Sequence, residues 1–145
     1  MAALAPPQAA SGTAAQRAAH NLYVEEQPMT RAEMPIFTRT FDLLAWLLPA
    51  TNHFPRSYRH SFTRRLLDAA FDLSESLLEA NLRYGEARLE RLARADEALD
   101  KLRHYLRLAA RLNWLGPGQY EHVAAIVAEI GRLLGGWRKV SAGRR

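Results

Sequence analysis

The sequence predicts an all-α protein, and more specifically an up-down four-helix bundle. After Pro35, apolar residues recur every three or four positions in four segments, which is the spacing of one helix face. No segment shows the apolar–polar alternation of a half-buried strand. The connections between the segments are short, and short connections make long neighbouring helices antiparallel. With 145 residues, of which 48% are hydrophobic, the chain has room for one domain whose core needs no disulfide.

Residues 1–34 differ in character from the rest of the chain. They are rich in alanine, contain proline and glycine, and show no sustained helical or strand period. We therefore expect a flexible N-terminal extension over 1–34 and a four-helix bundle domain over 35–145. The N-terminus lacks the charged and apolar regions of a signal peptide, and no apolar run approaches the ~20 residues of a membrane span. These features predict a cytoplasmic protein without a membrane partner.

The first predicted helix covers 36–48 and is short, because Pro49 is expected to end it. Its apolar face consists of Phe37, Phe41, Leu44 and Leu48. A polar connection leads to the second predicted helix, 57–83, for which Gly85 is a natural stop.

The third predicted helix covers 86–114, and the fourth covers 119–140. Between them, Gly116, Pro117 and Gly118 predict a turn, because this composition interrupts a helix.

The second helix carries more apolar surface than one core requires. Its core face is followed by a second apolar stripe, and together they exceed the arc of about 100° that a surface helix needs. Either this helix is the central one, or the protein is a homo-oligomer with a second apolar interface. On the other helices, Leu108 projects away from its own apolar face, and Gly131 and Gly135 lie on a ridge of small residues. The candidate oligomer interface is therefore Leu67, Phe71, Leu78, Leu82, Leu108, Gly131 and Gly135.

Residue types that carry chemistry are sparse. The chain has no cysteine, and no histidine has a glutamate three positions before it, so the Glu-x-x-His signature of di-iron bundles is missing. No nucleophile elbow or phosphate-binding P-loop is present. We expect no enzyme, no catalytic residue, no metal, no cofactor and no small-molecule substrate. A small nuclease that uses His60 or His104 is the remaining catalytic alternative.

The positive charge is almost entirely arginine, since only Lys101 and Lys139 among the 20 basic residues are lysine. Two groups of arginines oppose local helix preferences: one places cations at a helix start, against the dipole, and the other repeats like charges every four residues. The candidate binding residues are Arg56, Arg59, Arg64 and Arg65 in the first group and Arg103, Arg107 and Arg111 in the second. Such placement favours a polyanion such as a nucleic-acid backbone. The alternative is that these arginines form salt bridges with the acidic faces of neighbouring helices.

Four motifs in order resemble one family. They are Phe54-Pro55-Arg56, then Leu102-Arg103-His104-Tyr105-Leu106-Arg107, then Tyr120-Glu121-His122, and finally Glu129-Ile130-Gly131-Arg132-Leu133-Leu134-Gly135-Gly136-Trp137. This series, over about 34–140, resembles the accessory variability determinant proteins of bacterial diversity-generating retroelements. These are relatives of the four-helix proteins encoded in ribosomal-RNA intervening sequences. The Gly-Gly-Trp ending is the most specific element.

The resemblance implies a homopentamer that partners the retroelement's reverse transcriptase and its template-repeat RNA, with the cDNA as a further candidate ligand. In that family the pentamer supports mutagenic cDNA synthesis in retrohoming, and the polymerase performs the chemistry. The arginines above are then candidates for contact with RNA or polymerase, an assignment based on charge placement and not on matched functional positions. The alternative function is a protein-only interaction ring or adaptor of the intervening-sequence type, without RNA binding.

Overall fold

A computed structural model describes residue 14 and residues 34–143 of the chain. The expected extension over 1–34 therefore falls almost wholly outside the described residues, as do the last two residues of the expected bundle domain. Over 34–143 the long elements are four helices, and this part contains no strand. The helices are α3 (Pro35–Thr51), α4 (Arg64–Asn81), α5 (Gly85–Arg111) and α6 (Pro117–Ala142).

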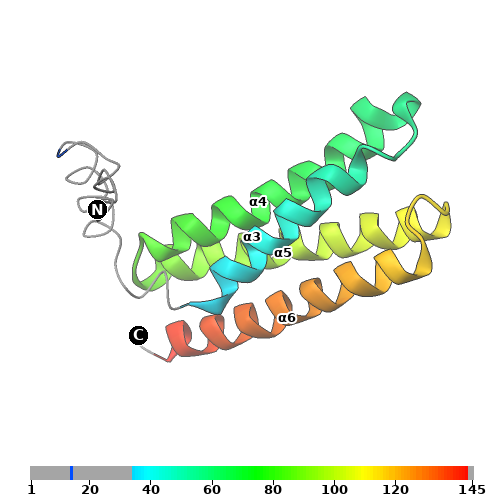
Figure 1. The fold of residues 1–145 in the computed structure, drawn as a ribbon. Helices are drawn as coiled ribbons and strands as arrows, with labels where there is room; N and C mark the ends of the chain where they lie inside the picture. Colours follow the sequence, from blue (N-terminus) through cyan, green and yellow to red (C-terminus); the bar gives the residue numbers. More distant parts are fainter. Residues whose placement is uncertain (1–13, 15–33, 144–145) are drawn as a thin grey trace, which may run out of the picture.

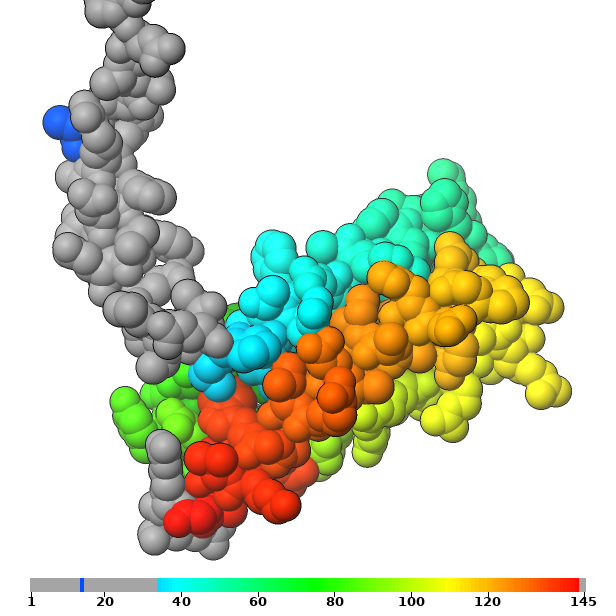
Figure 2. Space-filling model, turned by 60° about the horizontal axis from the view of Figure 1, so that its bottom comes forward, coloured from blue at the N-terminus to red at the C-terminus, as the bar shows by residue number. Residues whose placement is uncertain are grey.

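The four helices form a closed bundle in which successive helices run in opposite directions (Figure 1). Helix α4 packs on α5, α5 on α6, and α3 on both α4 and α6. Figure 2 shows α3 and α6 lying along each other on one face of the molecule. The predicted all-α class and the up-down four-helix arrangement are thus confirmed.

Leucine dominates the core, to which every helix contributes. The largest side chains with no exposed surface include Leu43, Leu47, Leu73, Leu77, Leu99, Leu102, Ile130 and Leu134. Burying one such side chain stabilises a fold by about 1.5–3 kcal/mol, so this common face is what holds the helices together. Buried alanines, such as Ala70 of α4 and Ala95 of α5, belong to the two helices that pack most extensively on each other.

Helix α3 does not end before Pro49 as predicted; it continues through that residue to Thr51. Proline lacks an N–H and crowds the carbonyl four residues before it, but the residues after Pro49 still adopt helical angles here. The amide groups of Asn52 and His53 donate to the carbonyls of Pro49 and Ala50, both at 3.2 Å, so the helix closes with tightened turns.

The predicted second helix over 57–83 is interrupted at its start. A 3-10 turn, η1 (Arg56–Tyr58), leads into a π-helical turn, η2 (Arg59–Thr63), before α4 begins. Tertiary packing explains the difference, because Tyr58 and Phe62 both contact the ring of Trp114, with centroids 5.0 and 5.1 Å away. Phe54, only 4% exposed, completes this aromatic cluster.

The residues of the connection between α5 and α6 determine where α5 ends and where α6 begins. Helix α5 stops at Arg111, short of the predicted 114, because Asn113 adopts a φ of 60°, a left-handed conformation that asparagine tolerates well. The Trp114 amide then donates to the Ala109 carbonyl at 2.9 Å. Helix α6 begins at Pro117, and the Gln119 side chain accepts a hydrogen bond of 2.9 Å from the Gly116 amide.

Candidate nucleic-acid interface

Within residues 34–143, three recorded ion pairs join neighbouring helices, and none of them uses a candidate binding arginine. Arg39 of α3 pairs with Glu129 of α6 at 2.9 Å. Arg91 of α5 pairs with Glu79 of α4 at 3.2 Å, and Arg138 of α6 pairs with Asp96 of α5 at 3.1 Å. The salt bridges between helices that the sequence left as an alternative therefore exist, but they involve other arginines.

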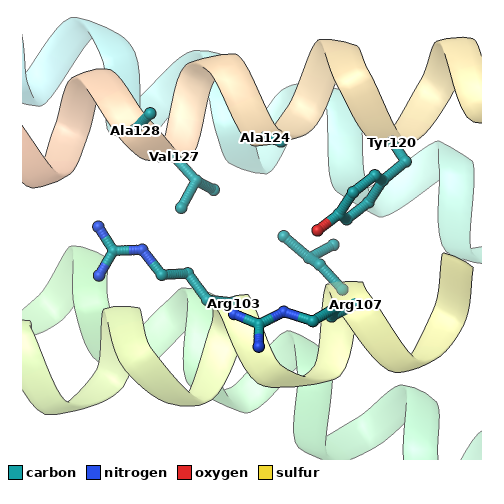
Figure 3. Close-up of a pocket in the computed structure, with 7 residues that line it drawn as sticks. Arg103, Arg107, Tyr120, Ala124, Val127 and Ala128 are labelled. Carbon is teal, nitrogen blue, oxygen red and sulfur yellow. The ribbon is translucent and has the colours of Figure 1, made fainter.

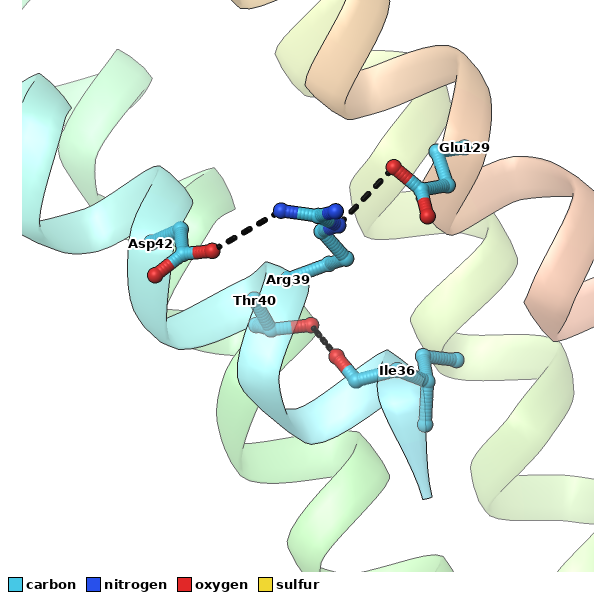
Figure 4. Close-up of polar contacts among 5 residues, drawn as sticks. All are labelled: Ile36, Arg39, Thr40, Asp42 and Glu129. Atoms are coloured by element: carbon cyan, nitrogen blue, oxygen red, sulfur yellow. Dashed lines mark hydrogen bonds and ion pairs between the residues drawn. The ribbon is translucent and has the colours of Figure 1, made fainter. Parts of the chain in front are cut away.

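Arg39 is an arginine whose ion pair connects two helices of the bundle (Figure 4). Its guanidinium lies between Glu129 and Asp42, and the hydrogen bond to Glu129 is the main cause of its raised pKa. One turn of the same helix is closed by Thr40, whose hydroxyl donates to the Ile36 carbonyl at 2.7 Å. The ion pair between Arg39 and Glu129 thus holds the start of α3 against α6.

The candidate arginines are placed differently. Arg103 pairs with Asp100 at 2.9 Å and Arg64 with Asp68 at 4.0 Å, in each case within its own helix. Over residues 34–143 the structure records no ion pair for the other five, Arg56, Arg59, Arg65, Arg107 and Arg111. Pairing with neighbouring helices thus does not account for their positions.

The first group of arginines is split between three local structures. Arg56 lies in η1 and Arg59 in η2, so only Arg64 and Arg65 stand in the first turn of an α-helix. That turn contains no acidic residue. The dipole of α4 therefore opposes the charges of these last two residues and not those of the earlier ones.

Aromatic contacts bring the two arginine groups to one end of the bundle. Tyr58 and Phe62, within the first group, contact Trp114 just after α5, and Phe62 also meets Tyr105 at 5.7 Å. The second group occupies the last turns of that helix, ending at Arg111. In Figure 1 the α3–α4 and α5–α6 connections lie at the same end of the molecule. No local pattern in the sequence indicates that the two groups meet there.

A pocket of about 200 Å³ opens between α5 and α6 beside the second group (Figure 3). Arg103 and Arg107 line it from α5, and the hydroxyl of Tyr120 points toward it from α6. Its remaining lining is apolar: Leu106, Ala124, Val127 and Ala128. Tyr120 was not among the predicted site residues, because only the packing of the two helices shows that it faces these arginines.

The guanidinium of Arg103 lies against Gly131 of α6. A Cβ atom built on Gly131 would collide with the terminal nitrogen of the Arg103 guanidinium and would also lie 3.6 Å from Leu99. The small residue predicted to receive a neighbouring helix thus receives an arginine side chain of the same protomer. At Gly135, in contrast, a Cβ atom would meet nothing within 4 Å.

The other predicted interface residues line the outside of the bundle to different extents. Leu82 is 74% exposed, Leu108 is 39% and Phe71 is 38%, whereas Leu67 and Leu78 are half-buried. On the neighbouring helix α3, Phe41 (73%) and Leu48 (42%) are also exposed. We call Phe41, Leu48, Leu67, Phe71 and Leu78 the α3/α4 strip. Leu48 and Leu67 line the same groove between these two helices.

The described residues contain neither a candidate metal site nor a helix that could span a membrane. Among these residues, no group of three or more histidine, aspartate or glutamate side chains is arranged to hold a metal ion. Nor is any helix in this part of the chain both long enough and apolar enough to cross a bilayer. Asp72, Glu75 and Glu79 of α4 line a polar groove together with Arg94 and Lys101 of α5.

Most of the chain matches a known family of proteins. The model of a family described as bAvd-like matches residues 34–141. No curated protein matches the chain. The region that the family model matches spans all four helices, including both arginine groups and the pocket between α5 and α6.

Proposed function

The chain belongs to the bAvd-like family of bacterial accessory variability determinants, whose role is accessory to diversity-generating retroelements, and we propose that it serves there by binding RNA. In this proposal the protein contacts template-repeat RNA and the reverse transcriptase, and it supports cDNA synthesis without catalysing it. The polymerase supplies the chemistry.

The observation that carries the proposal is the separation of the arginines into two kinds. Those that join helices, such as Arg39 and Arg138, have carboxylate partners on neighbouring helices. Those at the end formed by the α3–α4 and α5–α6 connections have no such partner in the described part of the chain. Guanidinium groups that are free of such partners attract phosphates and gain further from the release of counterions.

We also propose that the subunit assembles into a ring, as the sequence resemblance implied. A ring is built from two different patches on each protomer, which meet head to tail. The α3/α4 strip supplies one apolar patch. Leu108 and Leu112, 39% and 44% exposed on the last turns and end of α5, supply a candidate for the other.

The proposed RNA binding is tested by reversing charge at two adjacent turns of α5. We expect the double variant Arg103→Glu, Arg107→Glu to lose at least about ten-fold in affinity for RNA, because each arginine would contact a phosphate. The slope of log affinity against log salt should become shallower by roughly 0.7–0.9 for each phosphate that is no longer neutralised. Fluorescence anisotropy of a labelled RNA across a salt series measures both quantities.

The matched control is Arg94→Glu, Arg132→Glu, which changes the net charge by the same amount at exposed positions outside the candidate surface. This control should retain most of the affinity. Equal losses in both double variants would show that net charge alone governs binding, and unchanged affinity in the first would remove Arg103 and Arg107 from the site. If the unaltered protein binds no RNA but still binds the polymerase, the protein-only adaptor is the correct function.

A further inference from the structure

We propose that the pocket between α5 and α6 receives one unpaired nucleotide of the bound RNA strand. The phosphate would lie on Arg103 and Arg107, and the base would lie against the apolar lining beside Tyr120. This inference rests on the proposed RNA binding and deepens it, because it states which kind of RNA element the surface prefers.

One wall of the pocket carries two positive charges to which a phosphate can bind. Arg103 and Arg107 stand one helical turn apart on α5 (Figure 3), and the guanidinium of Arg103 reaches Gly131 of α6. The structure, over its described residues, records no ion pair for Arg107, and the partner of Arg103 is Asp100, a carboxylate 70% exposed to solvent. Water screens such an exposed pair, so it competes weakly with a phosphate, which guanidinium groups bind through paired hydrogen bonds.

The rest of the pocket has a different chemistry that a phosphate alone would not use. Ala124, Val127 and Ala128 present only apolar groups. A base has a hydrophobic face, so it gains free energy by leaving water for such a lining, and an aromatic neighbour adds to that gain. The Tyr120 hydroxyl, which points into the pocket, is placed to hydrogen-bond a polar edge of the base (Figure 3).

These features select an unpaired nucleotide over a duplex. In a duplex the bases are stacked and paired, so the molecule offers phosphates and sugars to a concave pocket. An unpaired base can turn away from its strand and enter. An acidic side chain of a protein partner would satisfy the two arginines, but it brings no flat apolar face to cover the lining.

The test fills the pocket without changing its charge. In the full-length chain, Ala124→Leu places three extra carbon atoms in a space of about 200 Å³. The matched control, Ala125→Leu, makes the same change at the next residue, which is exposed and does not line the pocket. Anisotropy titrations use a short RNA without self-complementarity and the duplex that it forms with its complement.

We expect Ala124→Leu to weaken binding of the single strand about five-fold or more, the loss that corresponds to one stacked base, and to leave duplex binding unchanged. Ala125→Leu should change neither. Unchanged single-strand affinity, or an equal loss for both RNAs, would overturn the inference while leaving the proposed RNA binding intact. Loss of polymerase binding without loss of RNA binding would also overturn it, since the pocket would then hold a protein side chain.

A second measurement needs no variant and decides the matter if Ala124→Leu loses helicity by circular dichroism. The unaltered protein is irradiated with a single strand that contains 4-thiouridine, and the crosslinked peptide is identified by mass spectrometry. A crosslink to the peptide that contains Tyr120 supports the inference. Crosslinks confined to other peptides would overturn it. Absence of all RNA binding by the unaltered protein would instead overturn the proposed function, and the inference with it.

Discussion

At the scale of single residues, the side chain of Arg103 packs against Gly131. The guanidinium occupies the space that a side chain on residue 131 would need, and it reaches the mouth of the pocket while Asp100 holds its other edge. The sequence singled out Gly131 as part of a ridge of small residues. It could not show that the neighbour is an arginine of the same chain, because that depends on how α5 and α6 are rotated against each other.

The substitution Gly131→Ala should raise the free energy of unfolding by up to about 1 kcal/mol. Alanine is favoured over glycine by about that amount in a helix interior. The new methyl group would displace only the flexible end of Arg103, which can move at little cost. Urea denaturation followed by circular dichroism measures the change, and Gly135→Ala, whose Cβ atom meets nothing, is the control.

A loss of stability in Gly131→Ala, alongside a gain in Gly135→Ala, would contradict this expectation. It would mean that the position of the Arg103 side chain stabilises the fold more than helix propensity does. A smaller particle mass in Gly131→Ala would indicate instead that residue 131 also lies in an interface between protomers, as its place on the small-residue ridge predicted.

At the scale of elements, Trp137 explains the family-like ending of α6. Its ring meets Phe37 of α3 edge-on with centroids 6.0 Å apart, and the Arg88 guanidinium of α5 lies 5.8 Å from its centre. The same arginine donates from Nε to the Ala80 carbonyl at the end of α4, at 3.0 Å. One aromatic residue and one arginine thus connect all four helices at the end opposite the candidate RNA surface.

We therefore expect Trp137→Ala to lower the free energy of unfolding by roughly 2–3 kcal/mol, somewhat less than for a fully buried tryptophan. Val140→Ala, three residues further along α6 and 54% exposed, should change it by less than about 0.5 kcal/mol. Both values come from the same urea titrations. A loss below about 1 kcal/mol for Trp137→Ala would show that the other contacts at this end suffice.

The helix boundaries show where sequence reasoning stops at this scale. Number, type and order of the helices follow from the spacing of leucines and from the turn at Gly116 to Gly118, since both are local signals. The interruption over Arg56–Thr63 is not local, because it arises from packing of Tyr58 and Phe62 on Trp114, more than fifty residues away. The candidate pocket was missed for the same reason.

At the scale of the whole molecule, the two ends of the bundle differ in how their charges are used. The ion pairs Arg91–Glu79 and Arg138–Asp96 lie toward the end where α3 begins. The five candidate arginines without a recorded ion pair in the described chain lie at the other end. In the described chain, ion pairs between helices are recorded toward one end and not at the other, and that second end is the one suited to a polyanion.

The proposed ring has a testable consequence at the α3/α4 strip. Phe71 lies in that strip and is 38% exposed, so a carboxylate there should be tolerated in a monomer but should disfavour an apolar interface, where it would be buried without a partner. We expect the unaltered chain to scatter light with a mass near five protomers of 16.4 kDa. Phe71→Glu should scatter as a monomer with unchanged helicity.

The control Val140→Glu puts the same charge on an exposed apolar position outside both patches and should keep the larger mass. A monomeric unaltered chain would refute the ring, whereas an unaltered mass in Phe71→Glu would exclude the α3/α4 strip from its interface. A ring repeats the arginine-rich end of each protomer around one axis. Loss of the ring should therefore also reduce RNA affinity by more than the arginines of a single protomer explain.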